Sequence, residues 1–372
     1  MDWWRLPGPQ RFVDEIANDL RGGRNVIVCL PLHVPSGLRT AVRSSLDQDI
    51  HWQSVPCSEL RGGTPVDNVY EWLNLSHSAQ ELRTINTLLN HPNFGGYYLW
   101  FEEMDRERWS LWRDFLPEYA NACRGMGILE RTVFCIPLTG PGALEVPPED
   151  VCLSIRRYEG YVSRLDMLVF ARGQDTEAAS SPVLDDLRVE IMAALAQWDA
   201  ILAEIMAGKP LDLLLNCAEW LREVAWSRGW GSPIPSSFLE AWAMGIVNRN
   251  NGLSHLHSCA CALHDIRELN RRLWKAQIRV LYPFLEEQRQ LILERAKPFI
   301  KLPYMARNGE LIDDIQNLEL SHIEAVLYLK FKRFNRDLLD RISILRKIRN
   351  ALAHMKTVDP AWLKTEAVLN PL

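Results

Sequence analysis

The hydrophobic positions in the first part of the chain change spacing from one short segment to the next. Phe12, Ile16 and Leu20 recur every four residues, which predicts a helix that ends at the glycine pair after residue 21. Residues 25–30 are an almost continuous apolar run, typical of a strand buried on both faces of a parallel sheet. Residues 37–42 then predict the start of another helix. This order of helix, strand, loop and helix indicates an α/β domain.

Further buried strands are expected at residues 96–103 and 131–138, and a shorter edge strand at residues 153–155. We therefore expect an α/β domain over residues 1–175, built on a parallel sheet with helices on both faces. The small and polar residues that follow predict a linker at residues 176–182.

From residue 183 onward the apolar spacing is almost wholly helical. Pro283 should kink or split the helix in which it lies, because proline lacks a backbone N–H and clashes with the preceding turn. The predicted fold is thus an α/β N-terminal domain followed by an all-α domain over residues 183–372. The expected helices cover residues 183–206, 211–226, 236–246, 265–294, 318–334 and 336–355.

Composition narrows the class of protein. The chain has 372 residues, of which 47% are hydrophobic and 24% charged, as in a soluble globular protein with a substantial core. Its formal net charge of −5 provides no general attraction for nucleic acid. No apolar run is long enough to span a bilayer, and the first residues lack the layout of a signal peptide. The eight cysteines are scattered, mostly in apolar runs, which indicates free buried thiols in a reducing compartment. We therefore expect a cytoplasmic protein without a membrane partner.

One segment near the C-terminus combines a helical stripe with residues that carry chemistry. Residues 344–354 have apolar positions at helical spacing, and the same helix carries Arg349, Asn350 and His354. This Arg-Asn-x-x-x-His sequence, in a helical region, resembles the signature of the HEPN family of helical domains. The resemblance covers about residues 262–372. It implies one of two functions, because many HEPN proteins are metal-independent ribonucleases and others are inert interaction modules.

RNA can be cleaved without metal when a base takes the 2′-OH proton, the oxygen attacks the adjacent phosphorus, and an acid protonates the leaving oxygen. The near-neutral pKa that is ordinary for histidine suits His354 to these proton transfers, and the guanidinium of Arg349 suits the charge that develops on phosphate. Asn350 is expected to orient the phosphate or the histidine. Arg349 and His354 are five positions apart, about 140° around a helix, so one helix makes an incomplete site. In the family two copies of the motif meet across a dimer, which implies a homodimer through the C-terminal helical domain.

The helices that lead to this motif carry many positive charges. A local basic surface can attract phosphate even on an acidic protein, so RNA or DNA is a candidate partner. A solvated helix face is an equally good interpretation of the same charges. The candidate nucleic-acid-binding residues are Lys330, Lys332, Arg333, Arg336, Arg346 and Lys347.

The loop at residues 32–40, after the first predicted strand, has the place of a phosphate-binding loop. Such a loop needs Gly-x-x-x-x-Gly-Lys-Ser/Thr, in which backbone N–H groups and lysine hold phosphate and Ser/Thr holds magnesium. Here the first glycine is missing, no lysine follows Gly37, and Arg39 and Thr40 are displaced by one position. The domain therefore resembles the AAA-type and STAND-type P-loop NTPases in layout but departs from them where nucleotide is held. Nucleotide is a candidate ligand, whereas ATP hydrolysis is not expected.

A second feature supports this layout. The strand expected at residues 96–103 ends in Glu102 and Glu103. In P-loop enzymes an acidic pair at this position holds magnesium and activates water. The two glutamates are therefore candidate cofactor-binding residues, with a strand end that carries solvated carboxylates as the alternative.

Three histidines and two cysteines lie within residues 255–264. On a helix, His257, Cys261 and His264 would share one face, as zinc ligands can. Zinc needs four ligands, or three and a water, and no second cluster in the sequence completes the set. We therefore predict no metal, and expect a helix whose small residues pack tightly against neighbouring helices.

Two functions remain open from the sequence. In the first, a nucleotide-binding-like sensor domain controls a C-terminal domain that cleaves RNA, as in bacterial defence and toxin systems with similar pairs of domains. In the second, the chain is a non-catalytic scaffold or regulatory subunit that docks a partner protein in a defence or nucleic-acid-processing complex. The incomplete phosphate loop favours the second function for the α/β domain.

Overall fold

A computed structural model describes residues 2–60, 63–78, 82–175, 181–250, 252–306, 309–331 and 336–372 of the protein. The chain divides into two compact units. The first, here named the sheet unit, comprises Met1–Asp166, Trp198–Ile201 and Ser232–His257. The second, the helical unit, comprises Met167–Gln197, Leu202–Gly231 and Ser258–Leu372. Of the expected linker at residues 176–182, residues 176–180 lie outside the described residues.

The sheet unit is built on a five-stranded parallel sheet, which confirms the α/β class predicted for this part of the chain. The strand order is β2-β3-β4-β1-β5, so β1 lies in the interior between β4 and β5. β2 was not expected from the sequence, because it has no continuous apolar run and is mostly half-buried at the edge. The strands are β1 (Asn25–Leu30), β2 (His51–Pro56), β3 (Tyr97–Glu102), β4 (Val133–Thr139) and β5 (Leu153–Arg157).

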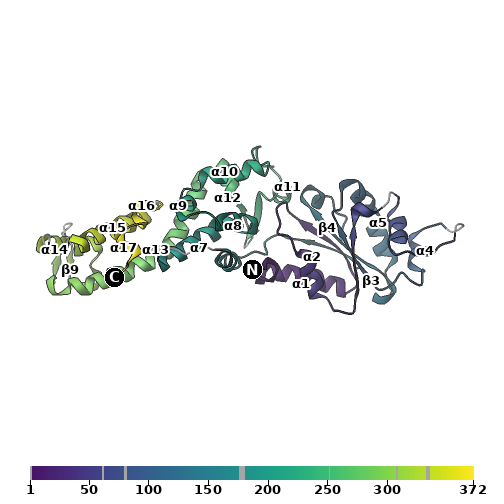
Figure 1. Ribbon diagram of the computed structural model, residues 1–372, viewed down its shortest axis with the longest axis horizontal. Helices are drawn as coiled ribbons and strands as arrows, with labels where there is room; N and C mark the ends of the chain where they lie inside the picture. Colours follow the sequence, from purple (N-terminus) through teal and green to yellow (C-terminus); the bar gives the residue numbers. More distant parts are fainter. Residues whose placement is uncertain are drawn as a thin grey trace. The chain divides into compact units, whose positions relative to one another are not determined.

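Helices cover both faces of the sheet (Figure 1). On one face, Phe101 and Phe134 pack around Trp112, with ring centroids 4.5 and 5.4 Å from that of Trp112. The other face is covered by α1, whose apolar stripe contacts β1 and β5, and by α2 beside it. The helices of this part are α1 (Pro7–Arg21), α2 (Leu38–Ser45), α3 (Pro65–Trp72), α4 (Ile85–Leu89) and α5 (Arg106–Ala122).

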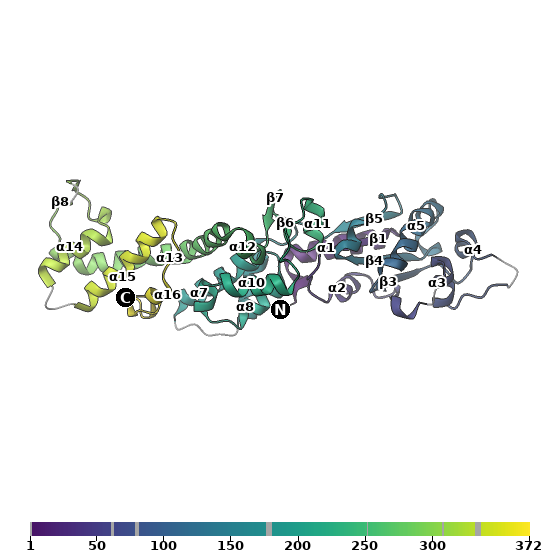
Figure 2. The ribbon, with the colours of Figure 1, turned by 90° about the horizontal axis from the view of Figure 1, so that it is seen from above.

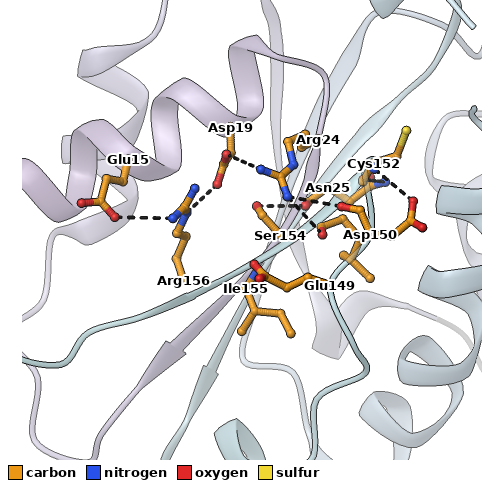
Figure 3. A network of polar contacts seen from close by, with 11 residues as sticks. Glu15, Asp19, Arg24, Asn25, Glu149, Asp150, Cys152, Ser154, Ile155 and Arg156 are labelled. Atoms are coloured by element: carbon orange, nitrogen blue, oxygen red, sulfur yellow. Dashed lines mark hydrogen bonds and ion pairs between the residues drawn. The ribbon is translucent and has the colours of Figure 1, made fainter. Parts of the chain in front are cut away.

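A polar network at the C-terminal end of α1 fixes that helix to the edge of the sheet (Figure 3). Asp19 is only 7% exposed and lies between two arginines. Its carboxylate accepts hydrogen bonds from Arg156 Nε on β5, at 2.5 Å, and from Arg24 Nη1, at 3.1 Å. Arg24 also donates to the backbone carbonyls of Asp150 and Leu153, at 3.2 and 3.4 Å. The network therefore joins α1, the start of β1 and β5.

Residues 232–257 complete the sheet unit. They form α11 (Phe238–Ala243) and an antiparallel hairpin of β6 (Val247–Asn250) and β7 (Leu253–Leu256). Trp242 of α11 is fully buried in the core of the sheet unit, and its Nε1 donates to the carbonyl of Tyr158 at 3.3 Å. The prediction of an all-α fold after residue 182 is therefore wrong here, because this segment packs on the sheet and folds into a hairpin.

The helical unit is organised around one long helix, α13 (Ile266–Ala296). α7 packs along α13, and α14 and α15 pack against α13 and each other (Figures 1 and 2). The C-terminus also returns to α13, where the N–H of Leu372 donates to Gln288 Oε1 at 2.9 Å. The remaining helices are α6 (Arg164–Gln174), α7 (Pro182–Ala196), α8 (Ala200–Ala207), α9 (Leu211–Leu215), α10 (Ala218–Ser227), α12 (Ser258–His264), α14 (Leu320–Phe331), α15 (Arg336–Ala353), α16 (Pro360–Leu363) and α17 (Glu366–Leu369).

Three expectations for the helices are wrong. Pro283 does not split its helix, because the packing of α13 along its length outweighs one missing backbone hydrogen bond. The helix expected over residues 183–206 is two helices, since Gln197 adopts a positive φ of 59° and ends α7. A short pair of strands, β8 (Tyr304–Met305) and β9 (Leu311–Ile312), interrupts the helical unit. In the part of the chain that is described, none of the helices combines the length and apolar character needed to cross a membrane.

Candidate functional site

α15 carries the Arg-Asn-x-x-x-His sequence at its C-terminal end. Its buried residues recur every three or four positions and leave Arg349 half-buried and Asn350 exposed at the flank. α15 ends at Ala353, and His354 follows in an exposed turn, where its backbone N–H donates to the carbonyl of Asn350 at 3.1 Å. The His354 ring makes no hydrogen bond or ion pair with the residues that the structure describes. The buried stripe of α15 consists of Ile342, Leu345, Ile348 and Leu352.

Arg349 forms an ion pair whose partner was not identified from the sequence. Its Nη2 lies 2.7 Å from Oε1 of Glu319, which precedes α14. The Arg349 side chain is 36% exposed and the Glu319 side chain 51% exposed. An exposed pair of this kind contributes only about 0–1 kcal/mol, because water screens both charges and the side chains lose freedom. Glu319 therefore holds Arg349 weakly, and a phosphate can compete for the guanidinium.

Arg349 and Asn350 line a cavity of about 400 Å³ within the helical unit. The walls come from α13, from residues 316–321 and from α15. His354 is not part of the lining and lies one helical turn beyond Asn350. The structure therefore brings Arg349 and Asn350 to one cavity and leaves His354 beside it. The lining residues are Tyr282, Leu285, Glu286, Arg289, Gln316, Asn317, Leu318, Glu319, Leu320, Ser321, Arg346, Arg349 and Asn350.

The predicted basic surface around α15 is partly neutralised. Arg346 Nε lies 3.0 Å from Glu324 Oε2 on α14, and Arg336 lies 3.9 Å from Asp340. Lys347 is exposed. Lys332 and Arg333 lie outside the described residues, as does the side chain of Lys330. Sequence spacing did not reveal the carboxylates on and before α14, because they meet α15 only after the two helices have packed together.

The loop at residues 32–40 is held by contacts within the sheet unit. Gly37 precedes α2 with a φ of 96°, a conformation that glycine adopts without strain. The indole N–H of Trp4 donates to the carbonyl of Ser36 at 2.9 Å. The backbone N–H of Leu32 donates to the carbonyl of Ala243 in α11 at 2.8 Å. A phosphate loop must keep its N–H groups for the ligand, and at Leu32 that donor is already used.

Arg39, Glu102 and Glu103 are further candidate cofactor-binding residues, and they lie at the carboxyl edge of the sheet. Arg39 of α2 forms an ion pair with Glu102 at the end of β3, and its Nη1 also donates to Ser54 Oγ of β2 at 3.1 Å. The structure therefore brings Arg39 and Glu102 together, although the arginine takes up the carboxylate that a magnesium site would need. Glu103 follows β3 with a φ of 54°, and both Glu103 and Thr40 are exposed.

The interpretation of residues 255–264 as one helical face is wrong. β7 ends at Leu256 and α12 starts at Ser258, so His257 lies in neither element. His257 is fully buried, and its Nε2 lies 3.1 Å from Oδ2 of Asp199. Cys261 is buried, which raises the pKa of its thiol to about 11, whereas His264 is exposed. Across the described ranges, no three or more His, Cys, Asp or Glu side chains are grouped so that they could hold a metal ion.

All eight cysteines are free and buried, which confirms the predicted state of the thiols themselves. Burial raises the pKa of Cys29 to about 12 and that of Cys57 to about 11, because a thiolate is poorly solvated in the core. These thiols therefore stay protonated near neutral pH and are poor nucleophiles.

The candidate chemistry of the chain thus lies in the helical unit, where Arg349 and Asn350 at the end of α15 line a cavity and His354 follows in the next turn. No protein-family model matches this sequence, and no curated protein matches it either.

Proposed function

We propose that the helical unit cleaves RNA without a metal ion and that Arg349, Asn350 and His354 carry the reaction. The observation that supports this proposal most strongly is the state of His354. Its ring is exposed and makes no hydrogen bond or ion pair among the described residues, and it lies one turn beyond Asn350 at the cavity. His257, by contrast, is buried and paired with Asp199, as expected for a structural histidine.

The proposed roles follow from the chemistry of the three side chains. One histidine takes the proton of the 2′-OH, whose oxygen then attacks the adjacent phosphorus. The bond from phosphorus to the 5′-oxygen breaks, and an acid protonates the leaving oxygen, so that the products carry a 2′,3′-cyclic phosphate and a 5′-OH. Arg349 stabilises the charge on the phosphoryl oxygens, and the Asn350 amide orients the phosphate.

A second copy of the chain is part of the proposal. The reaction needs a base and an acid at the same phosphate, whereas one copy of the motif offers a single histidine. A homodimer through the helical unit supplies two histidines and two arginines. Because His354 and Asn350 are exposed, a partner can reach them without unfolding α15.

We propose that the sheet unit is a sensor or clamp that does not hydrolyse ATP. Two contacts support this role. The N–H of Leu32, which a P-loop enzyme would need for phosphate, donates to Ala243, and the carboxylate of Glu102, which it would need for magnesium, pairs with Arg39. The pairing of such a unit with an RNA-cleaving helical unit fits a protein of bacterial defence or a toxin. Expression of the wild-type chain should then slow cell growth, and expression of the His354→Ala chain should not.

The second candidate function is that of a non-catalytic docking module. The ion pair of Arg349 with Glu319 favours it, because it gives the arginine a structural partner. In that case Arg349→Ala would change stability and partner binding and would leave no activity to be lost.

A cleavage assay in the presence of a chelator distinguishes the two functions. Single-stranded RNA is incubated with the wild-type full chain and with His354→Ala, Arg349→Ala and His264→Ala, the last being a matched exposed histidine of the helical unit. We expect cleavage by wild type and His264→Ala, and a loss of at least about 100-fold in the other two, because one lacks the acid–base group and the other lacks the group that stabilises charge on the phosphate. Equal rates in all four proteins, or no cleavage by wild type at any concentration, would overturn the proposal.

A further inference from the structure

The cavity beside Arg349 has polar groups that the cleavage chemistry does not use. Tyr282 of α13 is 47% exposed at its wall. Gln316 and Asn317, at the end of the 3-10 turn Ile315–Asn317, are exposed and also line the cavity. The side chains of these three residues make no hydrogen bond within the described part of the chain. The cavity therefore offers an aromatic ring and two free amides next to Arg349.

These groups match the parts of a nucleotide. A base without a pairing partner stacks on an exposed aromatic ring, and each stacked base contributes substantially to binding. Side-chain amides donate and accept hydrogen bonds in the pattern that base edges present. Guanidinium groups bind phosphate, and both Arg346 and Arg349 line the cavity. A volume of about 400 Å³ is in the range of ligand pockets, and it accommodates one nucleotide unit.

We propose that this cavity is a nucleotide subsite for one unpaired nucleoside monophosphate unit. The base lies on Tyr282 and meets the amides of Gln316 and Asn317, and the phosphate lies at Arg349 with Arg346 behind it. The inference rests on the proposed function only for the link between this phosphate and the bond that is cleaved. Binding in the cavity does not depend on His354, which is outside the lining.

Glu319 controls access to this subsite. Its carboxylate forms the ion pair with Arg349 and itself lines the cavity, so an arriving phosphate has to displace it. Removal of the Glu319 charge frees the guanidinium and removes a like charge from the path of the phosphate. Because the ion pair is exposed and weak, the expected gain in affinity is modest, about two- to fivefold.

Binding of fluorescently labelled single-stranded RNA to the full chain tests the subsite without cleavage. All proteins carry His354→Ala, so the strand stays intact. Tyr282→Ala should weaken binding roughly tenfold, because one stacked base is lost, whereas Tyr328→Ala, at a tyrosine 49% exposed on α14, should leave it unchanged. Glu319→Gln should tighten binding, and Glu294→Gln, at an exposed carboxylate of α13 outside the lining, should not.

Competition with nucleoside monophosphates shows whether the subsite binds a free nucleotide or a nucleotide within an RNA strand. If a monophosphate displaces the labelled strand at micromolar concentration, the subsite takes free nucleotide; if only RNA competes, it takes a nucleotide within a strand. Equal affinities of the Tyr282→Ala and Tyr328→Ala proteins would overturn the subsite. If RNA binds tightly in a way that depends on Tyr282 but the wild-type protein does not cleave it, the ribonuclease proposal is overturned and the subsite stands.

Discussion

The network around Asp19 permits a specific prediction for the stability of the sheet unit. Asp19→Asn keeps the size of the side chain but removes the charge that faces Arg156 and Arg24 (Figure 3). Among the described residues, Arg156 retains its ion pair with Glu15, at 3.6 Å, and Arg24 retains its two backbone carbonyls. A hydrogen bond to a charged group contributes about 1.5–3 kcal/mol, and the arginines are 30% and 31% exposed, which lowers the value for each bond. We expect the variant to be less stable by about 2–3 kcal/mol.

The pH dependence of this difference follows from the pKa of Asp19. Burial alone would raise this pKa, but hydrogen bonds from Arg156 and Ser154 and the charges of Arg156 and Arg24 lower it below its ordinary value. A carboxyl group with a lowered pKa in the folded state stabilises the fold fully above its unfolded pKa, which is about 4. That contribution is lost as the pH falls through the lowered folded pKa. The stability difference between wild type and Asp19→Asn should therefore be constant near pH 6–7 and shrink below about pH 4.

Urea denaturation followed by tryptophan fluorescence measures this difference. The matched control is Asp14→Asn, at an exposed residue of α1 that bonds only to Gln10 in the described structure. The control should change the free energy of unfolding by no more than about 0.5 kcal/mol. A loss in Asp19→Asn no larger than that of the control, or a loss that does not change between pH 6 and pH 3, would refute the reasoning.

Three further substitutions test other parts of the structure. Arg188→Met removes a buried guanidinium that lies 2.7 Å from Asp175 and donates to the Ala207 carbonyl at 2.7 Å, so thermal unfolding should show a loss of about 3–5 kcal/mol. Gly140→Ala should destabilise the sheet unit by about 1–2 kcal/mol in urea, because its φ is 63° and a Cβ would lie 2.7 Å from the Leu32 side chain. Arg39→Ala breaks an exposed ion pair and should change the free energy of unfolding by less than about 1 kcal/mol. Magnesium with ATP should not raise the Tm of the wild-type or the Arg39→Ala protein.

The strands of the sheet were predictable where they are buried on both faces. β1 and β4 are almost continuous apolar runs, and this pattern places them without knowledge of their neighbours. β2 was missed because an edge strand is half-exposed and has no such run. Residues 232–257 were assigned to the helical part because their spacing does not reveal that Trp242 packs into the core of the sheet unit.

The residues of the candidate site were likewise predictable only where they are neighbours along the sequence. The residue types and spacing of Arg349, Asn350 and His354 could be recognised along the sequence, because they lie on one short helical segment. Glu319 could not, since it is 30 positions before Arg349 and meets it only through the packing of α14 on α15. The same holds for Tyr282 of α13, whose place at the cavity depends on three separate segments.

The mass of the purified protein in solution, measured beside RNA cleavage at the same concentrations, tests the central claim most directly. We predict a homodimer that cleaves RNA in the presence of a chelator, with activity that falls on dilution together with the dimer. Cleavage should be lost in His354→Ala while the dimer stays intact. A monomer that cleaves at the same specific rate at every concentration would contradict the shared site. A protein that never cleaves RNA, whatever its mass, would contradict the ribonuclease itself.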